Sequence, residues 1–576
     1  MDKPSIKLTR SRHVVTVSGK TLKSLRSNQH NLLGHLRWHG YRVEDVSYTT
    51  TARRMHEGLR CAYSVMSTHD LIDVLQRDVK ENINPRKVSG RSSIVFMFTG
   101  QGATYPGMAN DLFKTCEVFR KRILQLNSIS MALGFSSFLE VITTSDRETR
   151  HLSPIQVHLA LVCLEISLSA VWKSWGIMPD MVLGHSLGEY AALCTAGVLS
   201  VYDTIFLVGN RARLMEAHCT PYTHSMLSVE HDLESVKDHL QTGSFHACDI
   251  ACVNGPLAIV VSGPLQDLID LKRSLGGVRS TMLEVPFAFH SSQVDPILGS
   301  FGKLFSNVMF CEPEIPVVST LTGDKVEVGG VFGPEYLIRQ TRDPVKFLQA
   351  ITTSKYGAHD SNSIWLEIGP APVCLRLLHS IQRLPPERTL STLQRKQSCW
   401  SSITCALVHL YEAGVNVRWS EYHKEDSVGL KLLDLPTYAF DLQNYWIPYE
   451  GYSTLMKSIY PTTKPPHPRI SATCLHWIEE IVDNNECCTV TYGTDLRDAS
   501  LFEIVNGHRV NGFGLCPSSL YIDMALTAAL HLYQNIQGFS TSSDMSLMDL
   551  EISHPLVVTE EDDVYRIKVH CKYIFR

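Results

Sequence analysis

Residues 181–193 read MVLGHSLGEYAAL, in which a short apolar strand is followed by a sharp turn around Ser186 and then by a helix. The turn has the pattern G-x-S-x-G, with glycines at positions 184 and 188. Small residues on both sides of a serine permit the strained strand-to-helix turn, the nucleophile elbow, that lifts the hydroxyl out of a sheet. The same pattern occurs by chance in loops, but here the strand and the helix that it requires are both present. We therefore predict an α/β fold with Ser186 as a nucleophile.

The same turn predicts where an acyl oxyanion would be stabilised and which residue would act as the base. Backbone N–H groups at the start of a helix lie at the positive end of its dipole, so the Leu187 N–H is the expected first donor. Among 25 histidines, His290 is the best candidate for the base. It follows a strand-like segment in the stretch PFAFHS at 286–291, where we expect it to face a cleft beside the turn.

Alternating strands and helices surround this stretch. Residues 94–98 are predicted to form a buried strand that ends in the turn 99–102, and helical periodicity covers 155–174; this alternation is typical of α/β folds. An insertion at about 224–285 has the β-α-β-β-α-β pattern of ferredoxin-like units. Its expected elements are strand 225–229, helix 232–241, strands 249–253 and 258–262, helix 265–275 and strand 281–285.

Four motifs occur in order along the chain: FTGQG at 98–102, GHSLGEY at 184–190, NRA at 210–212 and FAFH at 287–290. Together they resemble the malonyl-CoA:acyl-carrier-protein acyltransferase domains of fatty acid and polyketide synthases. The resemblance covers residues 93–450. It implies an α/β-hydrolase-like core that carries a ferredoxin-like subdomain, in agreement with the pattern of the insertion.

The resemblance implies a ping-pong acyl transfer. His290 would take the proton of Ser186, whose oxygen attacks the malonyl thioester and releases CoA. The phosphopantetheine thiol of an acyl carrier protein would then attack the acyl-serine. Gln101 matches the position that completes the oxyanion hole with Leu187. No bound cofactor is implied, because the phosphopantetheine belongs to the carrier protein; a ketosynthase, in the full synthase or in trans, is the other implied partner.

The resemblance also implies the residues that recognise the substrate. Arg211 matches the arginine whose guanidinium fork binds the free carboxylate of malonate, whereas the nearby Arg213 is expected to be an ordinary exposed arginine. Phe289 matches the position that contacts the α-carbon of the extender unit in the family. A bulky ring at this position favours malonyl over methylmalonyl groups. The backbone carbonyl of Asp343, where asparagine is commoner, is expected to orient His290. A serine nucleophile, in place of the cysteine common in starter-unit acyltransferases, argues for loading of extender units.

The flanks of the transferase resemble parts of fungal non-reducing polyketide synthases. Residues 1–92 begin with a basic arm, expected to be a solvated or interface-forming face, and continue with helical sequence at 24–39 and up to about 79. They are similar to the linker between a ketosynthase and its acyltransferase. LPTYAF at 435–440, with YW at 445–446, resembles the linker that wraps back over such domains, and 451–469 form a proline-rich linker.

The final segment, 470–576, contains GHRVNGFGLCP at 507–517, which fits H-x-x-x-G-x-x-x-x-P. It resembles the first hotdog, an α+β fold, of a product-template domain, which is related to dehydratases. There His508 would be the base for aldol cyclisation. Because the family needs a second hotdog for the acidic partner, we expect a truncated, aggregation-prone domain and no cyclase activity from this chain alone.

Composition excludes several other classes of function. With 53 basic and 58 acidic residues, the net charge of -5 indicates no overall field for nucleic acid or anionic lipid. The 16 cysteines have no short repeated spacing, which favours reduced thiols, and no zinc-ligand spacing or nucleotide-binding glycine loop predicts a metal or redox cofactor. Residues 1–10 have no apolar stretch, and Leu159–Trp172 is too short for a membrane span. We therefore predict a cytoplasmic multidomain protein without nucleic-acid or membrane partners.

Two alternatives remain open at this point. A serine acyl hydrolase would share the same core, although Arg211 argues against a simple lipase, whose apolar acyl chain has no use for a carboxylate-binding residue. The other alternative is an inactive, truncated fragment of a synthase that acts only as an interaction module.

Overall fold

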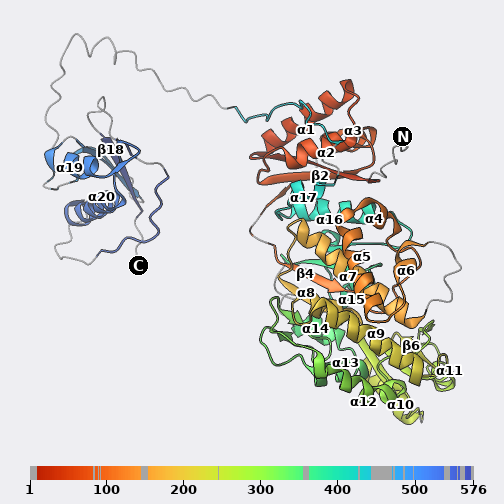
Figure 1. Cartoon of the computed structure of the whole chain (residues 1–576). Coiled ribbons are helices and arrows are strands. Elements are labelled where there is room, and N and C mark those ends of the chain that lie inside the picture. The colour runs from red at the N-terminus through yellow and green to blue at the C-terminus, as the bar shows by residue number, and fades with distance from the viewer. Residues whose placement is uncertain are drawn as a thin grey trace, which may run out of the picture. The chain divides into compact units, whose positions relative to one another are not determined.

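The computed structural model describes residues 10–81, 85–88, 90, 92–144, 153–243, 245–353, 362–425, 429–442, 470, 472, 474–483, 487–496, 498–536, 545–553, 556–557 and 565–572. The chain divides into two compact units, Met1–Gln443 and Asn444–Arg576, which Figure 1 displays in red to cyan and in blue. The first unit holds both Ser186 and His290. The predicted proline-rich linker at 451–469 and the YW pair at 445–446 lie outside the described residues.

A six-stranded sheet forms the centre of the first unit, in the order β11-β10-β5-β4-β12-β13. All neighbours pair in parallel except β11, which runs antiparallel to β10. Every residue of β4, β5 and β12 is buried, as expected for a parallel sheet covered on both faces. The strands are β4 (Ile94–Phe98), β5 (Met181–Gly184), β10 (Val317–Val318), β11 (Lys325–Val326), β12 (Ile364–Ile368) and β13 (Thr389–Ser391). The predicted α/β class is confirmed.

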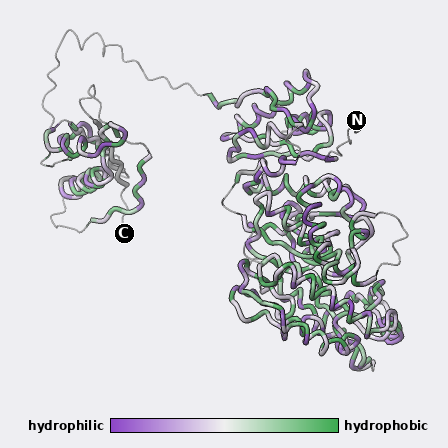
Figure 2. Tube along the Cα trace, viewed as in Figure 1, coloured by the Kyte–Doolittle hydropathy of each residue, from purple (hydrophilic) through white to green (hydrophobic). Residues whose placement is uncertain are grey.

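Both faces of this sheet carry a hydrophobic core, because successive residues of a strand point to opposite sides. Phe96 and Phe98 of β4 belong to the larger core, whereas Val95 and Met97 belong to a second one. Figure 2 shows apolar residues throughout the interior of this unit. Its helices outside the insertion and the N-terminal region are α4 (Asn110–Thr115), α5 (Glu117–Ala132), α6 (Leu139–Thr143), α7 (Pro154–Ser174), α8 (Gly188–Thr195), α9 (Val201–His218), α12 (Asp295–Lys303), α13 (Pro334–Arg342), α14 (Phe347–Thr353), α15 (Val373–Ile381), α16 (Cys399–Glu412) and α17 (Trp419–His423).

Helix α7 lies in the larger core and is buried along most of its length. It begins with a capping box between Ser153 and Gln156, and Pro154 occupies the first turn, where a missing N–H costs no hydrogen bond. Among the described residues, α7 is long and apolar enough to cross a membrane, but 78% of its most apolar window is buried inside the protein. We interpret α7 as a core helix.

The insertion has the element order that its pattern predicts. β6 (His224–Val229), α10 (Leu233–Thr242), β7 (Asp249–Gly255), β8 (Ala258–Pro264), α11 (Leu265–Ser274) and β9 (Ser280–Leu283) follow one another along the chain. The four strands form an antiparallel sheet in the order β7-β8-β6-β9. Leu227 and Val229 of β6 pack in one core with residues of α10 and α11, whereas Met226 belongs to the core beneath the six-stranded sheet. The insertion is therefore docked on the transferase through the face that α10 and α11 leave uncovered.

The N-terminal region forms a small α+β layer with its own core. β1 (His13–Gly19) and β2 (Leu59–Val65) pair antiparallel, with the short β3 (Arg86–Lys87) beside β2. The predicted helical sequence is present in α1 (Leu22–Trp38) and α3 (Thr68–Glu81). A further helix, α2 (Val43–Ala52), lies between α1 and β2, and the two long strands were not predicted. Arg10 of the basic arm is buried over the rings of Trp400 and Tyr422, at 4.6 and 4.3 Å. This arginine therefore forms an interface with the transferase.

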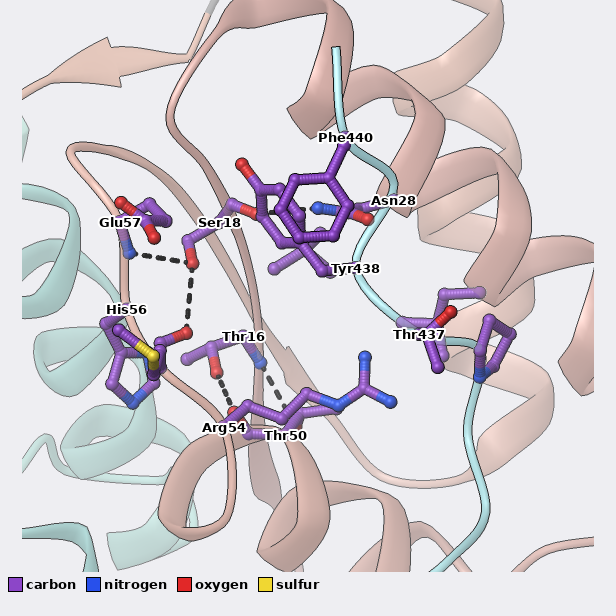
Figure 3. A pocket seen from close by; sticks show the side chains of 14 residues that line it. Thr16, Ser18, Asn28, Thr50, Arg54, His56, Glu57, Thr437, Tyr438 and Phe440 are labelled. Carbon is purple, nitrogen blue, oxygen red and sulfur yellow. Dashed lines mark hydrogen bonds between the residues drawn. The ribbon is translucent and has the colours of Figure 1, made fainter. Parts of the chain in front are cut away.

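Residues 429–442 return to the N-terminal layer as a strap. Leu435 lies in the core of that layer, the Lys20 N–H donates to the Tyr438 hydroxyl (2.8 Å), and the Ala439 N–H donates to Asn28 Oδ1 (2.7 Å). A pocket of about 560 Å³ lies between this strap and the N-terminal layer. Figure 3 shows Tyr438 and Phe440 on one side of it. The Arg54 side chain points into the pocket and donates to the Leu435 carbonyl at 3.0 Å.

The second unit contains, within its described residues, a three-stranded antiparallel sheet in the order β14-β15-β18. Val490 and Tyr492 of β15 share a core with Leu520 and Met524, which lie on the longest helix. Its elements are β14 (Trp477–Asp483), β15 (Cys487–Thr494), α19 (Ala499–Gly507), β16 (Arg509–Val510), β17 (Phe513–Gly514), α20 (Ser518–His531) and β18 (Tyr565–Lys572). This unit mixes helix and antiparallel strand; its tendency to aggregate stays a prediction.

Candidate active site

Ser186 lies in the turn between β5 and α8 with a φ of 50°, a backbone conformation uncommon for residues other than glycine. Such strain costs about 1–3 kcal/mol and is concentrated at functional sites. Close packing requires the flanking glycines: a Cβ at Gly184 would lie 2.3 Å from the backbone N of Glu189. A Cβ at Gly188 would lie 2.5 Å from the carbonyl O of Phe98. The structure therefore forms the turn that the G-x-S-x-G pattern predicts.

His290 contacts Ser186 directly. The Ser186 Oγ lies 2.7 Å from His290 Nε2, and His290 Nδ1 lies 2.9 Å from the carbonyl O of Asp343. Because a carbonyl oxygen only accepts hydrogen bonds, Nδ1 carries the proton and Nε2 presents a lone pair to the serine hydroxyl. This arrangement places Nε2 where a general base would take the serine proton.

The carbonyl of Asp343 is held in place from two sides. The residue caps the C-terminus of α13, and its side chain turns away from the histidine to pair with Arg339 at 3.0 Å. Two residues later, the Val345 N–H donates to the Ala251 carbonyl (2.9 Å), and the Val345 carbonyl accepts from the Val253 N–H (2.8 Å), so β7 of the insertion fixes this segment. Since the hydrogen bond to the imidazole comes from the backbone carbonyl, an aspartate in place of the commoner asparagine does not change that contact.

His290 is 1% exposed and Ser186 is 9% exposed. Burial, together with the nearby charge of Arg211, lowers the pKa of His290 to about 3. A depressed pKa keeps the imidazole neutral at physiological pH. The base form is therefore the resting form of His290.

Arg211, on α9, is buried close enough to His290 for its charge to affect the histidine. Its Nε donates to the Thr341 hydroxyl at 3.3 Å, and its Nη1 has no hydrogen-bond partner among the described residues. A buried guanidinium with an unpartnered N–H group is suited to bind an anionic group. Arg213, by contrast, is exposed and donates to the Gly134 carbonyl (2.9 Å), as predicted for an ordinary surface arginine.

Gln101 and Leu187 leave the sheet at the same edge. β4 and β5 pair in parallel with Phe98 opposite Gly184, so the turns after the two strands are neighbours. The turns also touch, because a Cβ at Gly100 would lie 2.8 Å from the His185 carbonyl O. The structure thus brings both predicted oxyanion-hole residues to the side of the sheet where Ser186 stands.

Glu189, the first-turn residue of α8, stabilises the turn around Ser186 through hydrogen bonds, a role that was not predicted. Its buried carboxyl accepts a hydrogen bond from the Tyr336 hydroxyl, and the Thr320 hydroxyl lies between the Glu189 carboxyl, at 2.8 Å, and the Gly184 carbonyl, at 3.0 Å. Burial raises the pKa of Glu189 to about 7. Gln340 adds a further contact, since its Nε2 donates to the Ser186 carbonyl at 2.7 Å. The glutamate is part of the GHSLGEY motif, but nothing in the local sequence marked Gln340.

Phe289 and two histidines complete the surroundings of the catalytic pair. Phe289 is buried, and its ring centroid lies 5.9 Å from that of His158 on α7. His185, the residue before the serine, donates from Nε2 to Asn254 Oδ1 at 2.8 Å and so ties the elbow to β7 of the insertion. His158 was missed because an isolated histidine on an apolar helix resembles an ordinary core residue.

His508 belongs to the second unit, whereas Ser186 belongs to the first. It is exposed, and its Nδ1 donates to the Leu515 carbonyl at 3.1 Å. Its role as a cyclisation base stays a prediction. Within the described part of the chain, no group of three or more His, Cys, Asp or Glu side chains is arranged to hold a metal ion.

Comparison with protein families gives three matches along the chain. The family model "Acyl transferase domain" matches residues 95–416, "Polyketide synthase dehydratase domain" matches 489–572, and "CurL-like, PKS C-terminal" matches 13–75. The first match spans more than half of the chain and contains Ser186, Arg211, His290 and Asp343.

Curated relatives match nearly the whole chain. It is 42% identical over 566 residues to the non-reducing polyketide synthase crz7 of Cladonia metacorallifera and 41% identical to the non-reducing polyketide synthase PKS16 of Cladonia grayi. Each match covers 97% of this chain but only 27% of the relative. The chain therefore spans about a quarter of the length of these synthases.

Solved acyltransferase domains share the fold. The domain of ZmaA superposes with a TM-score of 0.66 at 24% identity, covering 75% of this chain and 100% of that one. The SpnD domain, solved in complex with 2-(pent-4-yn-1-yl)malonyl, gives a TM-score of 0.62 at 26% identity and covers 71% of this chain and 97% of its own. With its strand order, its elbow serine and its matched family model, the chain belongs to the acyl transferase domain family, and it is related along nearly all of its length to fungal non-reducing polyketide synthases.

Proposed function

We propose that this chain loads malonyl units from malonyl-CoA onto an acyl carrier protein through an ester on Ser186, as the transferase part of a non-reducing polyketide synthase. The observation that carries the proposal is the 2.7 Å contact between Ser186 Oγ and His290 Nε2 beside the buried Arg211. The family match and the synthase relatives support acyl transfer in polyketide formation and do not favour the hydrolase or the inactive fragment. The malonyl derivative bound by the SpnD domain supports a malonyl-type substrate.

In the first half-reaction, Ser186 Oγ bonds to the thioester carbon while its proton passes to His290 Nε2. The backbone N–H groups of Leu187 and Gln101 stabilise the oxyanion, each donor contributing roughly 10²–10³ in rate. The carbon–sulfur bond then breaks, and the CoA sulfur takes the proton from Nε2. In the second half-reaction the phosphopantetheine thiol gives its proton to His290 Nε2, and its sulfur bonds to the acyl carbon. The ester carbon–oxygen bond then breaks, the Ser186 oxygen takes the proton back from Nε2, and the acyl group leaves as a thioester of the carrier protein.

Arg211 would hold the free carboxylate of the malonyl group, because a buried guanidinium presents parallel N–H groups to a carboxylate. The ring of Phe289, one residue before the base and buried, would leave little room for a substituent on the α-carbon. This favours malonyl over methylmalonyl.

The remaining parts of the proposal concern architecture and partners. We assign residues 1–92 to the linker that precedes the transferase and 93–450 to the transferase, which has an α/β-hydrolase-like core. Residues 451–469 would form a second linker. Residues 470–576 would form the first hotdog of a product-template domain, with His508 as its base. The strand order of the insertion supports a ferredoxin-like subdomain. The partners are malonyl-CoA, a carrier protein whose phosphopantetheine is the only prosthetic group needed, and a ketosynthase, all in the cytoplasm.

Arg211→Ala is the variant that tests substrate choice. The wild-type chain is expected to move malonyl groups from CoA to a phosphopantetheinylated carrier protein, and Arg211→Ala to lower that rate by about 100- to 1,000-fold, because truncating one partner of a buried charge pair is costly. Transfer of acetyl groups, which have no free carboxylate, should change little. The measurement is the initial rate of carrier acylation from radiolabelled malonyl-CoA and acetyl-CoA.

Arg213→Ala, at the exposed neighbour on the same helix, is the matched control and should retain both rates. Release of free malonate in place of carrier acylation would support a hydrolase. Equal losses for malonyl and acetyl groups would contradict the role of Arg211.

A further inference from the structure

Two neighbouring side chains near Ser186 hold buried polar atoms without partners. Within the described residues, Nδ1 and Nε2 of His158 and Nη1 of Arg211 make no hydrogen bond. Both side chains are 1% exposed. In folded proteins about nine in ten buried polar groups are hydrogen-bonded, so these atoms of His158 and Arg211 remain available to a polar group that enters the site.

His158 lies on α7, which packs against α9, the helix that carries Arg211. Its ring lies 5.9 Å from the ring of Phe289, centroid to centroid, and the charge of Arg211 acts on it. The histidine therefore stands beside both residues to which the proposed function assigns recognition of the acyl group. Within the described residues, no hydrogen bond accounts for the burial of this imidazole on α7.

The chemical state of His158 determines what it can bind. Burial, together with the charge of Arg211, lowers its pKa to about 3, so the ring is neutral at physiological pH. A neutral imidazole has one N–H donor and one acceptor nitrogen. Beside a guanidinium that binds a carboxylate, the N–H is the useful group, because a carboxylate has acceptor sites beyond those that one arginine fills.

We propose that His158 is a specificity-determining residue of the acyl site, whose ring N–H donates to the malonyl carboxylate held by Arg211. This inference rests on the proposed function and deepens it. It makes recognition of the carboxylate a two-residue property, with a charged ligand from α9 and a neutral one from α7. Acetyl groups, which lack the carboxylate, gain nothing from His158.

The test is the ratio of acylation rates of the full chain with radiolabelled malonyl-CoA and acetyl-CoA under single-turnover conditions. His158→Leu and His158→Met remove the donor and are expected to lower the malonyl rate by about 10- to 100-fold, the loss associated with one hydrogen bond to a charged group. The acetyl rate should stay close to that of the wild type. His158→Gln keeps an N–H donor and should restore most of the malonyl preference.

Ser167→Ala is the matched control, because Ser167 is also buried on α7 and donates only to the Cys163 carbonyl within its own helix (2.7 Å). It should leave the ratio unchanged. An unchanged ratio in His158→Leu and His158→Met, or equal losses for both substrates, would overturn the inference and leave His158 with a packing role. Lack of malonyl labelling in the wild-type chain would overturn the proposed function itself, which separates the two failures.

Discussion

Ser186→Ala is expected to abolish labelling of the chain by radiolabelled malonyl-CoA. The serine hydroxyl is the group that lies 2.7 Å from the base His290, and its backbone is held at a φ of 50° by the packing of two glycines. Alanine fits the same turn but offers no nucleophile. Loss of the nucleophile in serine-histidine enzymes costs ~10⁴-fold or more, which places the variant below detection. The measurement is acid-stable radioactivity on the purified full chain.

Ser174→Ala serves as the control for this experiment. Ser174 is the last residue of α7 and donates to the Val171 carbonyl at 2.6 Å, so its loss should not affect labelling. Equal labelling of Ser186→Ala and the wild type would show that another side chain accepts the acyl group.

His290→Ala is expected to slow formation of the acyl-serine by about 10²- to 10⁴-fold, the usual contribution of a positioned general base. The serine remains in place, but no group takes its proton. Single-turnover acylation, measured by rapid quench with excess chain over malonyl-CoA, isolates this step from release to the carrier. A rate equal to that of the wild type would remove His290 from the mechanism.

The pH profile of the same step provides an independent check. Since burial and Arg211 lower the pKa of His290 to about 3, the base stays unprotonated as the pH falls from about 8 to about 5. The acylation rate should therefore be nearly constant over this range, whereas an imidazole with the ordinary value of ~6.5 would lose more than tenfold. A tenfold fall centred near pH 6.5 would contradict a depressed pKa.

The elbow and the insertion could be predicted because their signals are local. In the insertion, strands and helices alternate within about sixty residues, and the predicted strand 258–262 lies inside β8 (Ala258–Pro264). At the elbow, the backbone of neighbouring residues approaches Gly184 and Gly188 so closely that a side chain would not fit. The two glycines are therefore visible in the sequence as part of the motif. Such short-range constraints leave a clear pattern.

Long-range pairings could not be predicted in the same way. β1 pairs with β2, as in His13 opposite Val65, and helices separate the two strands in the chain. The basic residues around β1 predicted a solvated or interface-forming face, and the sequence alone could not show that Arg10 packs on the rings of Trp400 and Tyr422, about four hundred residues further along the chain. The proposed role of His158 likewise could not be predicted, because it depends on Arg211 and Phe289, which are distant from it in the sequence.

The most direct test of the proposed mechanism is the site of acylation. The full chain is incubated briefly with malonyl-CoA, digested, and its peptides analysed by mass spectrometry. We expect one malonyl group per chain, on the peptide that contains Ser186, and its transfer to a carrier protein when one is added. A malonyl group on another residue, such as the exposed Cys311 or Cys405, with Ser186 unmodified, would contradict the mechanism.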